Sequence, residues 1–473
     1  MSALPRLSLS LCLAGALLCL VRAAPAQEPL EARLRARAAA LGPRVEWSLL
    51  VADVSGEVLA AHEAERALIP ASNMKLLTTL AALELLGPDF AHETRVLVAA
   101  APVEGVVQGD LFVVGGGDPT ISRRFDPSPL LSDWAAALWD KGLRRIGGDV
   151  VIDDRCFEAQ RFHPAWEASD GEEWYGAEIG GLTLNDGCLD VIVSGGQEGP
   201  KVQLEPPTAY LTLDLQARPT GAKKEHSFAL TRTGPDKRTL RVSGKVWTRA
   251  GGYEASVPVP DPGLYFACVL REALVRQGIA VDGAARRVRE GETPAGLTVW
   301  QRRAPLPRTL EVTNQRSQNL YAESLLKTLG QVRRGEGSWK AGAAELQAFA
   351  RAAGVPEGQV VVSDGSGLSR ENRLSARALV TVLQRALRGP HAELYLGTLA
   401  VPGEEGTLRS RLRDLGQGVT LHGKTGTMTG IHGLSGVLVK GERRVVFSFL
   451  GNGPGAVRQA LDEMVKETAR TLR

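Results

Sequence analysis

The sequence predicts an α+β fold, in which helices cover an antiparallel sheet, with a large and mostly β region inserted into it. After Val299, predicted helices and neighbouring strands are mixed, and the last two strands form a hairpin around residues 440–443. From about Cys156 to Pro294, helical periodicity is nearly absent, and Gly and Pro turns separate short alternating strands. A chain of 473 residues is also too long for one simple core. We therefore expect two or three domains.

The N-terminus has the pattern of a secretory signal peptide. Arg6 precedes an apolar run from Leu7 to Val21, too short to span a membrane comfortably, and an Ala-x-Ala site ends at Ala26. We expect residues 1–26 to be removed on export; a signal anchor is the alternative. The remaining chain has 54 Lys and Arg against 53 Asp and Glu, and this near-neutral charge gives no electrostatic argument for nucleic acid.

The mature chain is predicted to open with a helix, a hairpin and a second helix. Glu28–Leu41 has the apolar stripe of a helix, and Val45–Val54 and Glu57–Ala61 alternate as two strands. The second helix begins near Ser72 and ends at Gly87-Pro88, a glycine followed by a helix breaker. Its apolar residues recur every three or four positions, at Leu76, Leu77, Leu80, Leu83 and Leu86.

Residues 94–299 are predicted to be an inserted region of two small, mostly β domains. The predicted strands are Thr94–Ala100, Val106–Val114, Asp149–Asp153, Leu189–Val193, Tyr210–Leu215, Ser227–Thr231 and Thr239–Val246. Pro127–Gly142 and Pro262–Gln277 have helical periodicity. Residues 27–93 and 300–473 would then make up the other domain.

The C-terminal part supplies the remaining helices and strands of that domain. The predicted helices are Ser317–Leu329, Ser338–Ala353, Ser375–Leu387 and Gly455–Leu472, and the predicted strands are Gln359–Val362, Val419–Gly423, Leu434–Val439 and Arg444–Leu450. Adjacent antiparallel strands with helices between them are typical of a sheet covered by helices.

The helix that begins near Ser72 carries a candidate nucleophile and base. Ser72 and Lys75 are three residues apart, so their side chains lie side by side on one helical face, with Thr79 one turn further. A serine hydroxyl needs a base within hydrogen-bond reach, and a lysine among apolar neighbours loses its proton more readily. The same spacing recurs at Ser324 and Lys327, which we expect to be ordinary surface of an amphipathic helix.

Two further short motifs follow in a fixed order. Ser317-Gln-Asn319 follows the polar residues Thr313–Arg316 in a predicted loop just before a helix. Lys424-Thr425-Gly426-Thr427 ends a predicted strand. Each motif arises readily by chance. All three together, on a helix start, a loop and a strand, resemble the serine acyl transferases of the penicillin-binding and β-lactamase type.

More specifically, the chain resembles the low-molecular-mass class C penicillin-binding proteins, the D-alanyl-D-alanine carboxypeptidases and endopeptidases. The family-like strings are Glu173–Ala177, Leu184-Asn185, Asp364–Asn372 and Val401–Thr407, and the gap between Ser72 and Ser317 is long enough for that family's insertion. The resemblance implies a transpeptidase-like fold with a large insertion between the first two motifs. Gln318 and His422 depart from the usual pattern and leave the chemistry intact.

The resemblance also implies a function. It predicts an exported, periplasmic serine peptidase that cleaves peptidoglycan stem peptides or cross-links through an acyl-enzyme on Ser72 and is inhibited by β-lactams. Lys75 would be the base, or an ion anchor only; Ser317 would relay a proton in the positive field of Lys424; and Asn319 would hold the substrate amide.

The predicted substrate-binding residues are Thr425, Gly426 and Thr427. Lys424 and Thr425 would bind the terminal carboxylate of the peptide, a charge-assisted contact. The backbone N–H groups of Ser72 and Thr427 would form the oxyanion hole.

Other interpretations remain open at this point. A β-lactamase or esterase on the same fold, and a catalytically silent cell-wall scaffold, are the alternative functions; no glutamate stands out as a deacylation base. Trp174 and Tyr175 are expected in the core rather than in a peptide groove. Cys156 and Cys188 could form a disulfide in an oxidising compartment, but no spacing resembles a metal site, so neither a metal nor a cofactor is expected.

Overall fold

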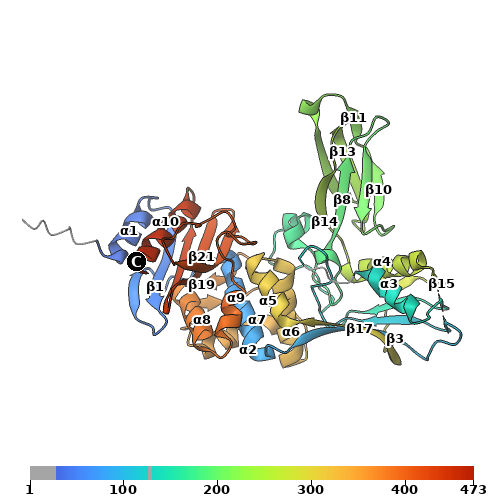
Figure 1. Ribbon diagram of the computed structural model, residues 1–473, viewed down its shortest axis with the longest axis horizontal. Helices are drawn as coiled ribbons and strands as arrows, with labels where there is room; N and C mark the ends of the chain where they lie inside the picture. The colour runs from blue at the N-terminus through green and yellow to red at the C-terminus, as the bar shows by residue number, and fades with distance from the viewer. Residues whose placement is uncertain (1–27, 126–129, 473) are drawn as a thin grey trace, which may run out of the picture.

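The computed structural model describes residues 28–125 and 130–472. The predicted signal peptide, residues 1–26, lies outside the described residues. Within the described ranges, no helix is both long enough and apolar enough to cross a membrane. The chain forms a helix-and-sheet body that contains both ends of the described chain, and an insertion that extends away from it and carries an upright β lobe (Figure 1).

A five-stranded sheet, in the order β2-β1-β22-β21-β20, is the centre of the helix-and-sheet body. Its strands are β1 (Glu46–Asp53), β2 (Val58–His62), β20 (Thr420–Met428), β21 (Ile431–Lys440) and β22 (Arg443–Asn452). All four neighbouring pairs are antiparallel. The predicted α+β class is confirmed.

Helices cover both faces of this sheet. Successive side chains of its strands point to opposite faces, and both faces are apolar. Leu49 and Phe447 belong to one buried cluster with α1 and α10, and Leu50 and Val446 belong to another with α2 and α5–α8. The helices are α1 (Leu30–Ala39), α2 (Met74–Leu86), α5 (Leu306–Gln315), α6 (Asn319–Arg334), α7 (Trp339–Ala352), α8 (Ala376–Arg388), α9 (Ala392–Gly397) and α10 (Val457–Ala469). A short pair, β18 (Val360–Val361) and β19 (Arg373–Leu374), lies between α7 and α8.

The chain enters the insertion through β3 (Ala91–Val98) and leaves it through β17 (Leu297–Pro305). These strands pair antiparallel from Ala91 opposite Pro305 to Val98 opposite Leu297, so both predicted boundaries of the inserted region fall within this stalk. The stalk belongs to a second five-stranded sheet, in the order β16-β7-β5-β3-β17. Its other strands are β5 (Leu111–Val114), β7 (Val150–Asp153) and β16 (Ala285–Arg287), and α3 (Leu131–Asp140) and α4 (Pro262–Gln277) pack beside it.

The upright lobe contains two small sheets, β14-β8-β9 and β10-β13-β11, with β12 paired to β13. One buried apolar cluster runs from the lobe into the sheet below it. The strands are β8 (Cys188–Ser194), β9 (Lys201–Glu205), β10 (Thr212–Leu215), β11 (Arg218–Thr220), β12 (Ser227–Thr233), β13 (Thr239–Trp247) and β14 (Tyr253–Pro258). The remaining strands, β4 (Val106–Val107), β6 (Arg145–Ile146) and β15 (Ala280–Val281), form a sheet of their own.

The polar loop predicted at Thr313–Arg316 is wrong. Thr313 and Asn314 lie in the last turn of α5, fully buried. The Thr313 hydroxyl donates back to the Thr309 carbonyl, and the Asn314 amide donates to the hydroxyls of Thr79 and Thr398. These polar side chains find their hydrogen-bond partners inside the protein. The sequence shows that the residues are polar but not where their partners lie.

The prediction that Ser324 and Lys327 are surface residues is also wrong. Ser324 is 1% exposed and Lys327 is fully buried. The Lys327 Nζ lies 3.1 Å from the Glu158 carboxylate, 3.4 Å from the centre of the Trp339 ring, and donates to the Gln160 carbonyl. A loop of the insertion supplies the two oxygen partners of the ammonium group, and α7 supplies Trp339.

The three cysteines of the described chain, Cys156, Cys188 and Cys268, are free thiols. The disulfide considered for Cys156 and Cys188 is therefore absent from the described residues. The Cys156 thiol faces the backbone carbonyls of Asp154 and Gly181, at 3.9 Å and 3.8 Å. Burial raises the pKa of Cys156 and of Cys188 to about 12, which makes both thiols poor nucleophiles.

Candidate active site

Ser72 lies in a single 3₁₀ turn, η1 (Ala71–Asn73), that leads directly into α2. The Asn73 side chain steadies this turn by donating to the Pro70 carbonyl at 3.1 Å. Two strands of the sheet pack closely on it: a Cβ at Gly433 would stand 2.3 Å from the Asn73 amide, and one at Gly426 2.6 Å from it. Glycine at these positions lets the strands approach, and the turn then presents Ser72 at the N-terminus of a helix.

Lys75 is fully buried one turn below Ser72. Its Nζ lies 2.9 Å from the Ser72 Oγ, 2.7 Å from the Asn319 Oδ1 and 2.8 Å from the Ser366 carbonyl oxygen. Burial lowers the pKa of Lys75 to about 7, although the nearby carboxylates of Asp364 and Glu323 act in the opposite direction. The amine is therefore close to its titration point at neutral pH.

Ser317 and Lys424 form a second polar pair beside the first. Ser317 lies between α5 and α6 and has a left-handed backbone, φ 59°. The buried Lys424 Nζ donates to the Ser317 Oγ and to the Thr425 carbonyl, both at 2.8 Å. Burial, and then the charge of Lys75, lower the pKa of Lys424 well below its ordinary value. The charged form of Lys424 is thus disfavoured by its surroundings.

Asn319 connects the catalytic helix to the insertion. It is the first residue of α6, and its Oδ1 accepts the hydrogen bond from Lys75. Its Nδ2 donates to the Tyr175 carbonyl at 2.9 Å, in the 3₁₀ turn η3 (Trp174–Gly176). The predicted contact between Asn319 and a substrate amide would have to share or displace this bond.

The outer edge of β20 faces the site. Gly423 and Ala400 exchange backbone hydrogen bonds across that edge, so the N–H and C=O groups of Gly423 point outward. Because edge groups alternate along an antiparallel strand, those of Thr425 and Thr427 point the same way. In the described part of the chain, β20 is the last strand of its sheet. Two backbone N–H groups are thereby directed at the space next to Ser72.

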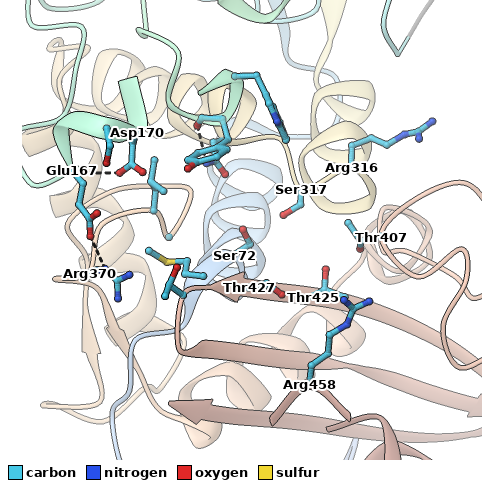
Figure 2. A pocket seen from close by; sticks show the side chains of 18 of the residues that line it. Ser72, Glu167, Asp170, Arg316, Ser317, Arg370, Thr407, Thr425, Thr427 and Arg458 are labelled. Atoms are coloured by element: carbon cyan, nitrogen blue, oxygen red, sulfur yellow. Dashed lines mark hydrogen bonds and ion pairs between the residues drawn. The ribbon is translucent and has the colours of Figure 1, made fainter. Parts of the chain in front are cut away.

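The predicted residues meet in one cavity of about 820 Å³. Ser72, Ser317, Asn319, Thr425 and Thr427 line it, as Figure 2 shows for the labelled members, while Lys75 and Lys424 are buried behind them. The position where Gly426 would carry a side chain faces η1, so only its backbone is available to a substrate.

Trp174 and Tyr175 line this cavity as well, and Trp174 is 44% exposed. The expectation that both are core residues is wrong, because η3 lines the cavity and its Tyr175 carbonyl is bonded to Asn319 of α6. The alternative considered for them, a groove wall, is what the structure has.

The two ends of the cavity differ in charge. At one end, Glu167 and Asp170 from the insertion lie near Arg370, and the Arg370 Nε donates to the Glu167 carboxylate at 3.0 Å (Figure 2). At the other end, Arg411 is paired with an aspartate on α10, whereas the Arg458 side chain has no hydrogen bond or ion pair within the described ranges. An unpaired cation near Thr425 suits an anionic group.

Two buried acids behind Lys75 were not singled out as site residues from the sequence. Glu323 is fully buried on α6, and Asp364 is fully buried in the loop before β19. Asp364 had been considered only for fixing loop geometry, which its bonds to the loop N–H groups of Gly367 and Ser369 support. Glu323 follows Asn319 by one helical turn, and that spacing was the available signal. Among the described residues, no group of side chains could hold a metal ion.

A profile of the D-Ala-D-Ala carboxypeptidase 3 (S13) family matches residues 30–471. A D-alanyl-D-alanine carboxypeptidase from Actinomadura sp. (strain R39) is 33% identical over 457 residues, covering 91% of this chain and 82% of the relative. The crystal structure of penicillin binding protein 4 (dacB) from Haemophilus influenzae matches with a TM-score of 0.77 at 22% identity, covering 93% of this chain and 99% of that one. A predatory peptidoglycan endopeptidase from Bdellovibrio bacteriovorus matches with a TM-score of 0.52 at 17% identity, covering 91% and 94%. These structures confirm the predicted penicillin-binding fold.

Proposed function

The chain belongs to the D-Ala-D-Ala carboxypeptidase 3 (S13) family and is a serine-type carboxypeptidase, and from this premise we propose that Ser72 is its acylated nucleophile. In the reaction, the Ser72 Oγ forms a bond to the carbonyl carbon of the penultimate D-alanine. The bond from that carbon to the nitrogen of the terminal D-alanine breaks, and water later releases the acyl group.

The hydrogen bonds of Lys75 are the observation that carries this proposal. Two of its three neighbours, the Asn319 Oδ1 and the Ser366 carbonyl, can only accept hydrogen bonds. A neutral amine gives its two N–H groups to these acceptors, which leaves its lone pair directed at the Ser72 hydroxyl, 2.9 Å away. Lys75 is then held as the general base that takes the Ser72 proton.

The departing amine needs a proton, and Ser317 is placed to deliver it. Its hydroxyl lines the cavity and accepts a hydrogen bond from Lys424. The Ser317 hydroxyl would donate its proton to the leaving nitrogen, and the proton that Lys75 took from Ser72 would then restore the hydroxyl. The outward N–H of Thr427 and the N–H of Ser72 would stabilise the negative charge on the carbonyl oxygen.

The charges at the two ends of the cavity suggest how the substrate is oriented. The terminal carboxylate of the peptide would lie at the hydroxyl of Thr425, with Lys424 behind it and Arg458 at the entrance. The acyl part would extend toward the insertion, along Trp174 and Tyr175. We assign peptidoglycan stem peptides as substrates, with cross-links admitted where the leaving group is larger than D-alanine, and β-lactams as acylating inhibitors that occupy the same cavity.

Mass spectrometry of the intact protein tests the nucleophile. Brief incubation with benzylpenicillin should add one penicillin to the wild-type protein and none to Ser72→Ala. Ser324→Ala is the matched control, since it removes the serine of the other Ser-x-x-Lys motif, and it should be acylated like wild type. An adduct that persists in Ser72→Ala, or steady penicillin hydrolysis without an adduct, would contradict the proposal.

We also propose that the protein acts in the periplasm after export, since peptidoglycan lies there. The support is the N-terminal sequence pattern ending at Ala26. Expression of the full-length chain in a bacterium with a periplasm should yield an extracted protein that begins at Gln27. An uncleaved chain that stays in the cytoplasmic fraction would refute this location.

A further inference from the structure

The loop Asp364–Gly367 contacts Lys75 through one peptide group. The carbonyl of Ser366 accepts a hydrogen bond from the Lys75 Nζ at 2.8 Å. The N–H of Gly367, on the other side of the same peptide group, donates to the Asp364 Oδ1 at 2.7 Å. The Asp364 carboxylate and the Lys75 nitrogen are therefore joined by two hydrogen bonds with a single amide between them.

Asp364 is itself held rigidly. Its Oδ1 also accepts from the Asn372 amide at 2.8 Å, and its Oδ2 accepts from the Ser369 N–H at 2.6 Å and the Trp166 indole N–H at 2.9 Å. The side chain is fully buried, and all four donors are neutral. The carboxylate is therefore held by four N–H groups and not by a direct ion pair.

Glu323 makes a parallel contact one peptide earlier. Its carboxylate accepts from the N–H groups of Ser366 at 2.7 Å and Gly365 at 3.1 Å. The Gly365 carbonyl in turn accepts from the Thr78 hydroxyl at 2.7 Å, on the turn of α2 that follows Lys75. Consecutive amides of one loop are thus fixed by two buried acids on one side and hold the catalytic helix on the other.

We propose that Asp364, with Glu323 as its partner, is a positioning residue that fixes Lys75 on Ser72 and stabilises the protonated form of the lysine through the Ser366–Gly367 amide. A carboxylate bonded to an amide N–H makes the carbonyl of that amide a stronger acceptor, and hydrogen bonds in a buried site reinforce one another in this way. The inference rests on the proposed role of Lys75 as the base.

The charged groups around Lys75 come from every element packed on it. Asp364 and Glu323 favour its protonated form, and burial opposes it most. Lys424 on β20 faces it as a second buried amine, whose own pKa is lowered by burial and by the charge of Lys75. Burial and the neighbouring Asp364 raise the pKa of Glu323. His163 and Lys327 face the same acids from the far side. Without Asp364, the lysine would be a weaker base than the reaction at neutral pH requires.

The test is the pH dependence of acylation by benzylpenicillin and of D-alanine release, in wild type and Asp364→Asn. The acid limb of both profiles should move to lower pH by about one unit, the size expected for loss of one nearby opposite charge. The plateau rate should fall at the same time. Asp118→Asn is the control for a buried carboxylate away from the site, because Asp118 lies in the insertion, bonded to the Thr120 N–H and paired with Arg302; its profile should keep the wild-type limb.

Two results would overturn the proposal: a lower plateau with an unmoved acid limb, or a limb that moves to higher pH. The amide introduced by Asp364→Asn would direct its NH₂ at N–H donors, so this variant could fail to fold. Glu323→Gln then serves as the second variant, with a smaller shift in the same direction expected, and an unmoved limb there overturns the proposal too. Failure of the proposed function is distinguishable, since it would appear as absent acylation of the wild-type protein.

Discussion

The protein contains two Ser-x-x-Lys pairs on neighbouring helices, Ser72 with Lys75 on α2 and Ser324 with Lys327 on α6. Both lysines are fully buried, and burial lowers the pKa of each, to about 7 for Lys75 and about 8 for Lys327. The pairs differ in their partners. Lys327 is ion-paired with a glutamate and stacked on Trp339, whereas Lys75 contacts only neutral oxygen atoms, and acids reach it through amides.

This difference separates a structural lysine from a candidate base. A direct ion pair keeps Lys327 charged and occupies its N–H groups. Among the described residues, no hydrogen bond links Lys327 to Ser324. Lys75 has a serine hydroxyl in reach, and that serine lines a cavity. Both pairs have the same spacing and a buried lysine. The candidate catalytic pair differs because its serine lines a cavity and its lysine is bonded only to neutral oxygen atoms.

The largest expected effects come from exchanging each lysine for methionine. Lys75→Met should lower the acylation rate by about 10³-fold or more, since general base catalysis typically contributes 10²–10⁴. The free energy of unfolding should change by no more than about 1 kcal/mol, because the methionine removes an amine that is unfavourable to bury but also removes the donor to the Asn319 Oδ1 and the Ser366 carbonyl.

Lys327→Met should give the opposite result. Acylation should stay within about twofold of wild type, while the free energy of unfolding should fall by about 2 kcal/mol, below the usual range for breaking a buried pair because Glu158 is partly exposed. Stopped-flow acylation and urea unfolding measure the two quantities. Equal loss of acylation in both variants would remove the distinction drawn between the pairs.

Two glycines with left-handed backbones sharpen the same comparison. Gly367, in the loop on Lys75, has φ 85°, and a Cβ there would stand 1.9 Å from the Ala71 carbonyl oxygen next to Ser72. Gly335, at the end of the helix that carries Lys327, has φ 74° and open space around that position. Gly367→Ala should therefore slow acylation at least tenfold, since η1 must move, whereas Gly335→Ala should cost only the backbone strain, about 1 kcal/mol. Acylation of Gly367→Ala at the wild-type rate would show that the turn tolerates the displacement.

The two lysines should also differ in what pH does to them. Acylation requires neutral Lys75, so its rate should rise about tenfold per pH unit up to about pH 7 and then level. An unfolded lysine has a pKa of 10.5, and the folded chain binds fewer protons between the two values, so each lysine makes stability rise with pH in its window, from about 7 or about 8 up to 10.5. Only Lys75 should appear in the acylation profile. A profile for Lys327→Met with a displaced limb would contradict this.

The smallest effect is expected at Arg458, the exposed cation that lines the cavity. Arg458→Gln should raise the KM for a peptide ending in D-alanine by about twofold to fivefold and leave kcat nearly unchanged, because an exposed charge contributes about 1 kcal/mol or less to binding a carboxylate. A peptide with an amidated C-terminus is the control substrate and should show no difference between the two proteins. If both substrates respond alike, Arg458 does not contact the carboxylate.

Much of the site could be predicted because its main residues follow local rules. A helix start at Ser72 and a strand at Lys424 are properties of short segments, and the order of three motifs is visible in the chain itself. Asp364 and Glu323 could not be assigned this way, since their effect on Lys75 depends on backbone amides that meet only in the folded protein. The burial of Asn314 and Lys327 escaped prediction for a related reason: their partners come from remote segments, including a loop of the insertion.

The pairing of β3 with β17 brings the two ends of the insertion side by side. Ala91 and Pro305 are opposite each other in that pair, so a short turn between them could replace the whole insertion without disturbing the sheet of the helix-and-sheet body. Such an excised protein would keep Ser72 and both lysines. It would lose the Tyr175 carbonyl that holds Asn319, the Trp166 indole that holds Asp364, and one wall of the cavity. The sheet of the helix-and-sheet body therefore does not depend on the insertion, whereas the active site does.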